Sequence, residues 1–312
     1  MNSKSSKFMP SLSREHVKKF IDSFDTVLTD CDGVLWVENN AIDGSPALIR
    51  RLVDLGKKVF YVTNNSTRNR QDYVEKCRKL GFPAEKEGII GTAYLVATYL
   101  KEINFNKKVF LIGSEGLAKE LDVAGIRYTG LGPDVMPEVW STLRSVEGDI
   151  ENHLDGEVGA VVVGFDPHFS YPKLIKAASY LSNPDCLYIA TNTDERFPVN
   201  SRLVYPGTGS LVAAVTACSA RSPLVLGKPN PYVADAIAKF HTLDPQRTLM
   251  IGDRGNTDIL LGTKCGFQTL LVMTGVTSKE ELAQWQCSEN AEERSLVPDY
   301  YVNKLGDLIQ FL

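Results

Sequence analysis

Short apolar runs alternate with longer amphipathic stretches along almost the whole of this 312-residue chain, and this rhythm restricts the fold more than any other feature. Most of the apolar runs are dense in Val, Ile, Leu, Phe or Tyr, as is typical of strands buried on both faces. Nine runs are predicted to be strands: Thr26–Thr29, Lys58–Thr63, Val109–Gly113, Gly159–Phe165, Leu187–Thr191, Leu224–Gly227, Leu249–Gly252, Thr269–Met273 and Tyr300–Asn303. Because helical stretches separate them, the sequence predicts an α/β fold with parallel strands.

Apolar residues recur with helical spacing between these strands. The predicted helices are Ala47–Leu55, Arg70–Leu80, Ala93–Glu102, Tyr171–Ser182, Ser210–Ala220, Tyr232–Phe240 and Asp258–Lys264. The stretch from Leu131 to Asp155 is rich in Gly, Pro and acidic residues, and we expect it to be a loop or linker. The length corresponds to about two domains, at roughly 100–200 residues per domain.

The charge balance disfavours several classes of protein. Lys and Arg number 34 and Asp and Glu 38, for a net charge of −4, and no long basic cluster is present. We therefore expect no nucleic-acid partner. No apolar run approaches the roughly 18 residues of a membrane span, so we expect a soluble protein without a membrane partner. If the ligand is a phosphate, its attraction has to be local.

The six cysteines are scattered, without a CxxC pair, and we expect reduced thiols in a cytoplasmic protein. A mitochondrial leader remains the alternative, because the first fourteen residues contain no acidic residue, although Glu15 follows them. Cys31 stands between two aspartates, which should raise the pKa of its thiol. We expect it to pack as a small apolar side chain, with oxidative inhibition as the alternative.

Polar residues follow four of the predicted strands directly. These segments are Asp30-Cys31-Asp32-Gly33, Thr63-Asn64-Asn65-Ser66, Gly227-Lys228-Pro229 and Gly252-Asp253, the last continuing to Thr257-Asp258. In an open α/β sheet, ligands bind outside the carboxyl ends of the strands. We therefore expect all four segments to meet at one sheet edge and to form a site.

Three of the acids in these segments, Asp30, Asp32 and Asp253, would repel one another unless a cation lay among them. Oxygen ligands without His or Cys suit a hard ion, and an ion that also shares a phosphate oxygen is best accounted for as Mg²⁺. Lys228 adds a positive charge, and two neighbouring carboxylates can divide the roles of nucleophile and acid. This combination favours phosphoryl transfer.

Together the four segments resemble the four motifs of the haloacid dehalogenase-type phosphatases. The resemblance is closest to the branch with a large cap inserted between the second and third motifs, which includes p-nitrophenyl, phosphoglycolate and pyridoxal phosphate phosphatases. It implies a doubly wound, mostly parallel core sheet with an inserted α/β cap domain. We expect the core over residues 1–104 and 205–312 and the cap over residues 105–204. The resemblance also implies a homodimer formed through the cap.

The resemblance implies a catalytic role for both aspartates of the first motif. Asp30 would attack phosphorus and form an aspartyl-phosphate, and Asp32 would protonate the leaving alcohol and then activate water. Thr63, Asn64, Asn65 and Lys228 would bind the phosphoryl group of a small phosphorylated metabolite.

The resemblance also implies which residues bind Mg²⁺. The carboxylates of Asp30 and Asp253 and the main-chain carbonyl of Asp32 would bind the ion, with Asp258 behind them. For Asp258 a helix-capping role is the alternative, since Thr257-Asp258 also has the composition of a helix start.

The segment Thr191–Pro198, followed by Pro206–Gly209, is similar to the specificity loop of these enzymes. Members that act on pyridoxal phosphate carry a histidine where this chain has Phe197, which favours 2-phosphoglycolate or glycerol 3-phosphate as the substrate. Arg196 could pair with a substrate carboxylate, or it could be a solvated loop residue.

Other functions are disfavoured by the same motifs. A dehydrogenase would carry GxGxxG after its first strand, whereas Gly207-Thr208-Gly209 lies mid-chain and is followed by Val212 at the third position. A pyridoxal phosphate or phosphoprotein phosphatase of the same family, a phosphotransferase and a non-catalytic binding relative remain alternatives. The four histidines lie outside the motifs, which disfavours a histidine-based zinc or triad mechanism.

Overall fold

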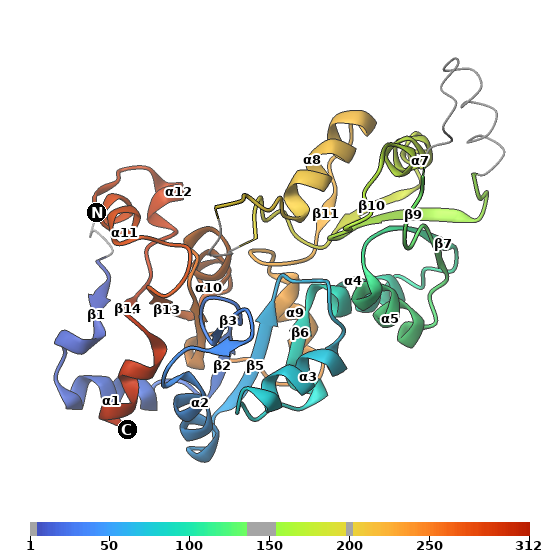
Figure 1. Ribbon diagram of the computed structural model, residues 1–312. Helices are drawn as coiled ribbons and strands as arrows, with labels where there is room; N and C mark the ends of the chain where they lie inside the picture. The colour runs from blue at the N-terminus through green and yellow to red at the C-terminus, as the bar shows by residue number, and fades with distance from the viewer. Residues whose placement is uncertain (1–4, 136–153, 198–201) are drawn as a thin grey trace.

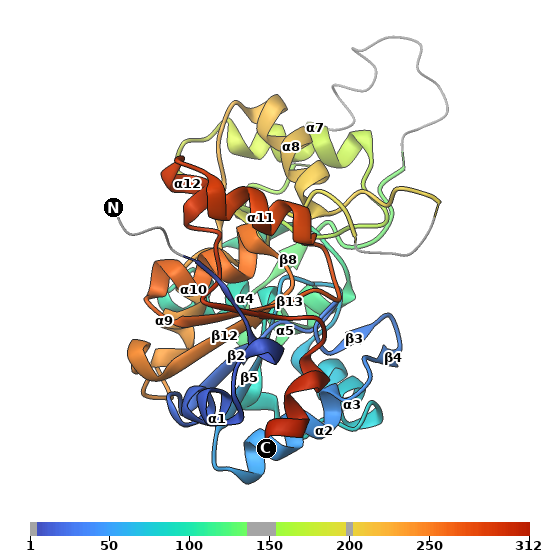
Figure 2. The same cartoon turned by 90° about the vertical axis from the view of Figure 1, so that its left-hand side faces the viewer.

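The computed structural model describes residues 5–135, 154–197 and 202–312. Most of the predicted loop Leu131–Asp155, together with Pro198 at the end of the predicted specificity segment, lies outside the described residues. The described residues form two parallel sheets, and Figure 2 shows the smaller sheet with its helices above the larger one.

The larger sheet has seven strands (Figure 1). Their order is β1 (Lys7–Phe8), β14 (Tyr300–Val302), β13 (Gln268–Val272), β12 (Thr248–Gly252), β2 (Thr26–Thr29), β5 (Lys58–Thr63) and β6 (Ile89–Gly91). Every neighbouring pair is parallel. The predicted α/β fold with a mostly parallel central sheet is therefore confirmed.

Helices cover both faces of this sheet because successive strand residues point to opposite sides. Val27 of β2 packs in a cluster with side chains of α1 (Arg14–Asp22), α2 (Ser45–Asp54) and α3 (Arg70–Lys79). Its neighbour Leu28 packs in a second cluster, with α4 (Thr92–Glu102), α9 (Tyr232–Ala238) and α10 (Leu260–Cys265).

The smaller sheet has five parallel strands, in the order β11 (Leu224–Val225), β10 (Leu187–Ala190), β9 (Val158–Val163), β7 (Lys108–Ile112) and β8 (Tyr128–Thr129). Helices α7 (Tyr171–Leu181) and α8 (Thr208–Ser219) cover one face. The other face, with α5 (Glu115–Ala124), joins the same hydrophobic cluster as Leu28. The two sheets therefore share one continuous apolar core.

The sequence predicts that all four motifs lie at the edge of one sheet. The third motif instead follows a strand of the smaller sheet. Strand β11, which precedes Lys228, pairs with β10 of the smaller sheet. Only the packing of the two sheets brings Lys228 to the end of β2. Both α8 and β11 lie beyond residue 204 and pack on the smaller sheet. The domain limits at 104/105 and 204/205 stay a prediction.

The remaining elements are short or lie near the carboxyl-terminal end. They are the antiparallel pair β3 (Trp36–Val37) and β4 (Asn40–Ala41), the helices α11 (Lys279–Cys287) and α12 (Ala291–Arg294), the 3₁₀ helices Met9–Ser11, Lys86–Gly88, Pro245–Arg247 and Leu305–Phe311, and the π-helix Gly255–Ile259. None of the helices in the described ranges combines the length and the apolar character that a bilayer crossing requires.

Candidate active site

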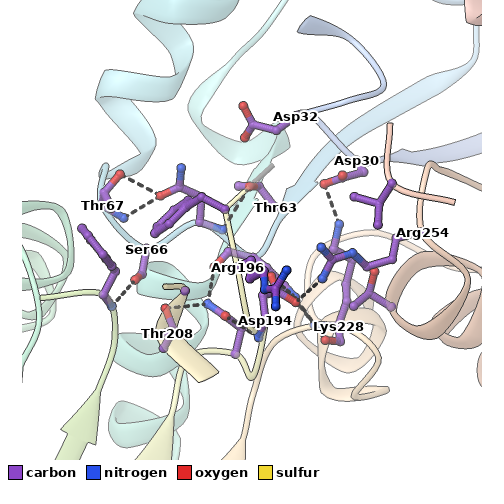
Figure 3. Close-up of a pocket in the computed structure, with 18 of the residues that line it drawn as sticks. Asp30, Asp32, Thr63, Ser66, Thr67, Asp194, Arg196, Thr208, Lys228 and Arg254 are labelled. Carbon is purple, nitrogen blue, oxygen red and sulfur yellow. Dashed lines mark hydrogen bonds and ion pairs between the residues drawn. The ribbon is translucent and has the colours of Figure 1, made fainter. Parts of the chain in front are cut away.

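A cavity of about 370 Å³ lies where the carboxyl ends of β2, β5 and β12 face the loops of the smaller sheet. Side chains from both parts of the chain line it (Figure 3). Eight of the predicted site residues line this cavity: Asp30, Asp32, Thr63, Asn64, Asn65, Arg196, Lys228 and Asp253. The ninth, Asp258, is 1% exposed and contacts Lys228.

Asp30 stands directly beyond β2, where its main chain still follows the parallel ladder. Its N–H donates to the carbonyl of Ile251 over 2.8 Å, which continues the pairing with β12. The ammonium nitrogen of Lys228 donates to Oδ1 of Asp30 over 2.6 Å. Burial raises the pKa of the Asp30 carboxyl, and the charge of Lys228 opposes that shift.

Lys228 is buried and binds to three groups. Besides Asp30, its Nζ lies 2.7 Å from Oδ1 of Asp258 and donates to the carbonyl of Val62 over 3.1 Å. Although burial acts to lower the pKa of Lys228, the carboxylates of Asp258 and Asp30 outweigh it and hold this pKa above its ordinary value. Lys228 is therefore a permanent cation.

Three buried carboxylates, those of Asp30, Asp253 and Asp258, can each offer an oxygen to a common point, since these atoms all lie within 4.8 Å of one another. Burial raises the pKa of Asp253 well above its ordinary value and that of Asp258 to about 6, because the charged forms are desolvated. When all three carboxylates are ionised, the positive charge of Lys228 balances one of them, and two negative charges remain. An all-oxygen donor set with this charge fits a hard divalent cation such as Mg²⁺.

Two glycines allow Asp253 to occupy this position. Gly33 has φ +83°, and a Cβ there would lie 2.7 Å from Oδ2 of Asp253. A Cβ on Gly275 would come within 1.7 Å of the same oxygen. This oxygen instead accepts a hydrogen bond from the N–H of Val276 over 2.8 Å. Glycine at these positions is therefore a steric requirement of the acidic cluster.

Asn64 binds other protein groups with its entire side chain. Its Oδ1 accepts from the N–H of Lys228 over 2.9 Å, and its Nδ2 donates to the carbonyl of Lys228 over 3.2 Å. The side chain is thus a bracket for the Lys228 main chain. Its Nδ2 also lies 3.3 Å from Oδ2 of Asp194 in the loop after β10.

Thr63 and Asn65 form the turn after β5. The N–H of Asn65 donates to the hydroxyl oxygen of Thr63 over 3.2 Å. Oδ1 of Asn65 accepts from the N–H and the hydroxyl of Thr67, over 2.9 and 2.7 Å. The oxygen of Asn65 therefore closes the turn, and only its amide nitrogen is left to face a ligand.

The Asp32 carboxylate lies apart from the acidic cluster. Its Oδ1 accepts from Nε1 of Trp36 over 2.8 Å and lies 3.7 Å from Nζ of Lys76. About a third of the side chain is exposed to the cavity, compared with 13% for Asp30. The two aspartates of the first motif thus occupy different environments, as a division into nucleophile and acid requires.

The loops after β9 and β10 of the smaller sheet form one wall of the cavity. Sequence reasoning missed the contacts that join these loops to the larger sheet. Nη1 of Arg254 donates to Oδ1 of Asp194 over 3.3 Å, which ties the loop after β10 to the fourth motif. The N–H of Phe165 donates to the hydroxyl of Ser66 over 3.4 Å, after β9. Both Asp194 and Arg254 lie in segments that the sequence singled out, but neither residue type carried a signal by itself.

Arg196 lines the same wall and is exposed to solvent. Its main chain forms an isolated antiparallel bridge with Pro206, so the two ends of this loop are joined beside the cavity. The neighbouring Phe197 packs edge-on against Phe165, with ring centroids 4.8 Å apart. The guanidinium of Arg196 is thus available to a ligand.

Comparison with known proteins gives a consistent result. Residues 27–127 match the family described as haloacid dehalogenase-like hydrolase, and residues 225–308 match that described as HAD-hydrolase-like. The chain is 43% identical to glycerol-3-phosphate phosphatase of Gallus gallus, with 96% of both chains covered. It is 39% identical to phosphoglycolate phosphatase 1A, chloroplastic, of Arabidopsis thaliana, with 96% of this chain and 81% of the relative covered. A p-nitrophenyl phosphatase from Archaeoglobus fulgidus superposes with a TM-score of 0.76 and 30% identity, over 93% of this chain and 100% of that chain.

Proposed function

The chain belongs to the haloacid dehalogenase-like hydrolases and is a phosphatase, and from that premise we propose that it hydrolyses small phosphate monoesters through an aspartyl-phosphate on Asp30. The observation that carries this proposal is the contact between Asp30 and Lys228. A carboxylate oxygen that lies beyond a strand end, contacts a buried cation and lines the cavity supports the role of nucleophile toward an incoming phosphoryl group.

The reaction proceeds in two displacements. In the first, an Asp30 oxygen forms a bond to phosphorus while the bond from phosphorus to the ester oxygen breaks, and Asp32 donates its proton to that leaving oxygen. In the second, a water oxygen attacks phosphorus and gives a proton to Asp32, and the bond between phosphorus and Asp30 breaks. Inorganic phosphate and the free alcohol are released, and Asp32 is protonated again.

Lys228 and the turn after β5 bind the transferring group. The ammonium of Lys228 faces Asp30 and neutralises part of the negative charge that gathers on the phosphoryl oxygens. Thr63 and Asn65 line the same cavity, and we expect the hydroxyl of Thr63 and the side-chain nitrogen of Asn65 to donate to those oxygens. Asn64 acts through Lys228, whose main chain it holds.

The acidic cluster supports a requirement for Mg²⁺. Asp30, Asp253 and Asp258 would hold the ion through carboxylate oxygens, together with the main-chain carbonyl of Asp32. When bound, the ion offsets the negative charge of the carboxylates and of the substrate phosphate, so that the two anions can approach.

We propose 2-phosphoglycolate or glycerol 3-phosphate as the substrate, and p-nitrophenyl phosphate as a convenient probe. Relatives with these names support the choice. Arg196 would pair with a carboxylate of the substrate. A pyridoxal 5′-phosphate or phosphoprotein phosphatase is the alternative, and Phe197 in place of histidine disfavours the first of these. A cytoplasmic location and a homodimer formed through the cap remain part of the proposal.

The test is Mg²⁺-dependent release of phosphate from p-nitrophenyl phosphate. EDTA should abolish it, and Asp30→Asn should lower it by several orders of magnitude because no aspartyl ester can form. An Asp30→Asn enzyme that kept its activity would exclude the mechanism. A non-catalytic relative would show no turnover at all, and a phosphotransferase would transfer the group to an added alcohol faster than to water.

Ranking kcat/KM for 2-phosphoglycolate, glycerol 3-phosphate, pyridoxal 5′-phosphate and a phosphopeptide identifies the substrate class. Arg196→Ala should raise KM for 2-phosphoglycolate more than for glycerol 3-phosphate, since only the first carries a carboxylate. An unchanged KM for 2-phosphoglycolate would remove Arg196 from the binding site.

A further inference from the structure

The Asp32 carboxylate is held by two side chains that belong to none of the phosphoryl-binding groups. Among the described residues, this carboxylate accepts a hydrogen bond from Trp36 and forms an ion pair with Lys76, and both contacts involve Oδ1. Figure 3 shows Asp32 beside Asp30 at the same end of the pocket, while Lys228 contacts Asp30. One oxygen of Asp32 is thus anchored, and Oδ2 is left to exchange a proton with the substrate.

Trp36 is rigidly placed with respect to Asp32. Its side chain is fully buried and packs edge-on against Phe82, with ring centroids 5.7 Å apart. The main-chain N–H of Trp36 donates to the carbonyl of Cys31 over 3.2 Å, and its main-chain carbonyl accepts from the N–H of Gly33 over 2.8 Å. A buried indole N–H needs a partner, and this tight turn makes Asp32 that partner.

Lys76 reaches the same carboxylate from helix α3. Its Nζ lies 4.5 Å from the centroid of the Trp36 ring and 3.7 Å from Oδ1 of Asp32, and its side chain is only 12% exposed. The helix that carries it begins at a capping box formed by Asn69 and Asp72, which fixes the first turn. The three side chains therefore form a closed triangle: Lys76 contacts both the ring and the carboxylate, and the ring contacts the carboxylate.

We infer that Trp36 and Lys76 are positioning residues for Asp32, which hold Oδ1 so that Oδ2 is presented to the leaving oxygen of the substrate. A carboxyl group that rotates freely presents the reactive oxygen in the right direction only part of the time. Anchoring one oxygen by a neutral donor and by a cation removes that freedom before the substrate binds. This inference rests on the proposed role of Asp32 as the acid.

The test uses the leaving group of the substrate. An alkoxide, as from 2-phosphoglycolate or glycerol 3-phosphate, needs a proton as it departs, whereas p-nitrophenolate is stable without one. The ratio kcat/KM covers the steps only as far as the departure of the leaving group, so the later attack of water does not affect it. A positioning defect at Asp32 should therefore lower kcat/KM for alkyl phosphates selectively.

Lys76→Met removes the ammonium and keeps an unbranched stem against the indole ring. We expect kcat/KM for the preferred alkyl phosphate to fall on the order of tenfold and that for p-nitrophenyl phosphate to change less than about twofold. Lys76→Arg should restore most of the loss. Trp36→Phe removes the N–H and keeps a ring, and it should show the same selectivity. Lys79→Met, at an exposed lysine of the same helix, is the matched control and should leave both ratios unchanged.

Two results would overturn the inference. An equal fall for both substrates would indicate a general structural defect. A rise in KM for the alkyl phosphate at unchanged kcat would make Lys76 a direct ligand of the substrate. Failure of the proposed function has a different signature, since the wild-type enzyme would then lack Mg²⁺-dependent activity or Asp30→Asn would retain it.

Discussion

The side-chain amide of Asn64 binds the main chain of Lys228 at both ends, with its oxygen accepting from the N–H over 2.9 Å and its nitrogen donating to the carbonyl over 3.2 Å. The two residues are 164 positions apart and follow strands of different sheets. Asn64 is only 7% exposed, so these bonds are shielded from bulk water in the folded protein. The contact fixes the point of the chain from which Lys228 reaches Asp30.

Asn64→Ala should therefore destabilise the protein and lower its activity together. Two buried main-chain groups of Lys228 would lose their partner, and we expect the free energy of unfolding to fall by about 1–3 kcal/mol. Urea denaturation measures this. Asn65→Ala is the comparison, since the side chain of Asn65 binds the neighbouring Thr67, and this substitution should cost less. Equal stabilities of the Asn64→Ala and wild-type proteins would contradict the bracket.

Mg²⁺ should stabilise the folded protein through the acidic cluster. At a Mg²⁺ concentration 100 times its Kd, the expected gain is about 2.7 kcal/mol, visible as a higher Tm after EDTA has been removed. Asp253→Asn should abolish the shift. Without metal, Asp253→Asn should be at least as stable as the wild type, because one desolvated charge is removed from beside two others. A Mg²⁺ shift of the same size in both proteins would place the ion elsewhere.

Asp194 should make the stability of the metal-free protein depend on pH. Burial raises the pKa of its carboxyl above the ordinary value, and Arg254 opposes the shift only in part. The folded state then binds the proton more tightly than the unfolded state, so the contribution of Asp194 is largest at low pH and decreases as the pH rises through its folded pKa. The difference in unfolding free energy between wild type and Asp194→Asn should follow this course. A difference that grew with pH would mean that Arg254 dominates.

Cys31 should be chemically inert in the folded protein. Its side chain is fully buried, and burial together with the charge of Asp30 raises the pKa of its thiol well above the ordinary value. Cys218 and Cys287 are exposed, so iodoacetamide at pH 8 should modify them first. Mass spectrometry of the folded protein reports the order. Modification of Cys31 as fast as Cys218, or loss of activity to peroxide that Cys31→Ser prevents, would favour the oxidative alternative.

The amino-acid sequence by itself determined the α/β fold and the set of polar residues that make up the site. Asp30, Thr63 and Asp253 each follow an apolar run, and parallel pairing of β2, β5 and β12 brings such positions to one edge, whatever the rest of the chain does. The strands can be predicted locally because a strand that is buried on both faces is a short run dense in Val, Ile, Leu, Phe or Tyr. Strand β6 is only three residues long and carries too little of this signal. Helix α1 was missed although Val17, Phe20 and Ile21 recur in it with helical spacing.

Only the tertiary structure decided what each polar side chain does. Asn64 and Asn65 are neighbours of the same type, yet Asn64 holds Lys228 and Asn65 closes a turn. Lys228 follows a strand of the smaller sheet. Lys76 is one of two lysines on α3, and only its contacts with the Trp36 ring and Asp32 distinguish it. The physical reason is that a hydrogen bond or an ion pair is gained or lost when the distance between its two atoms changes by a few tenths of an ångström. Those distances follow from how whole sheets and helices pack, which no short stretch of sequence specifies.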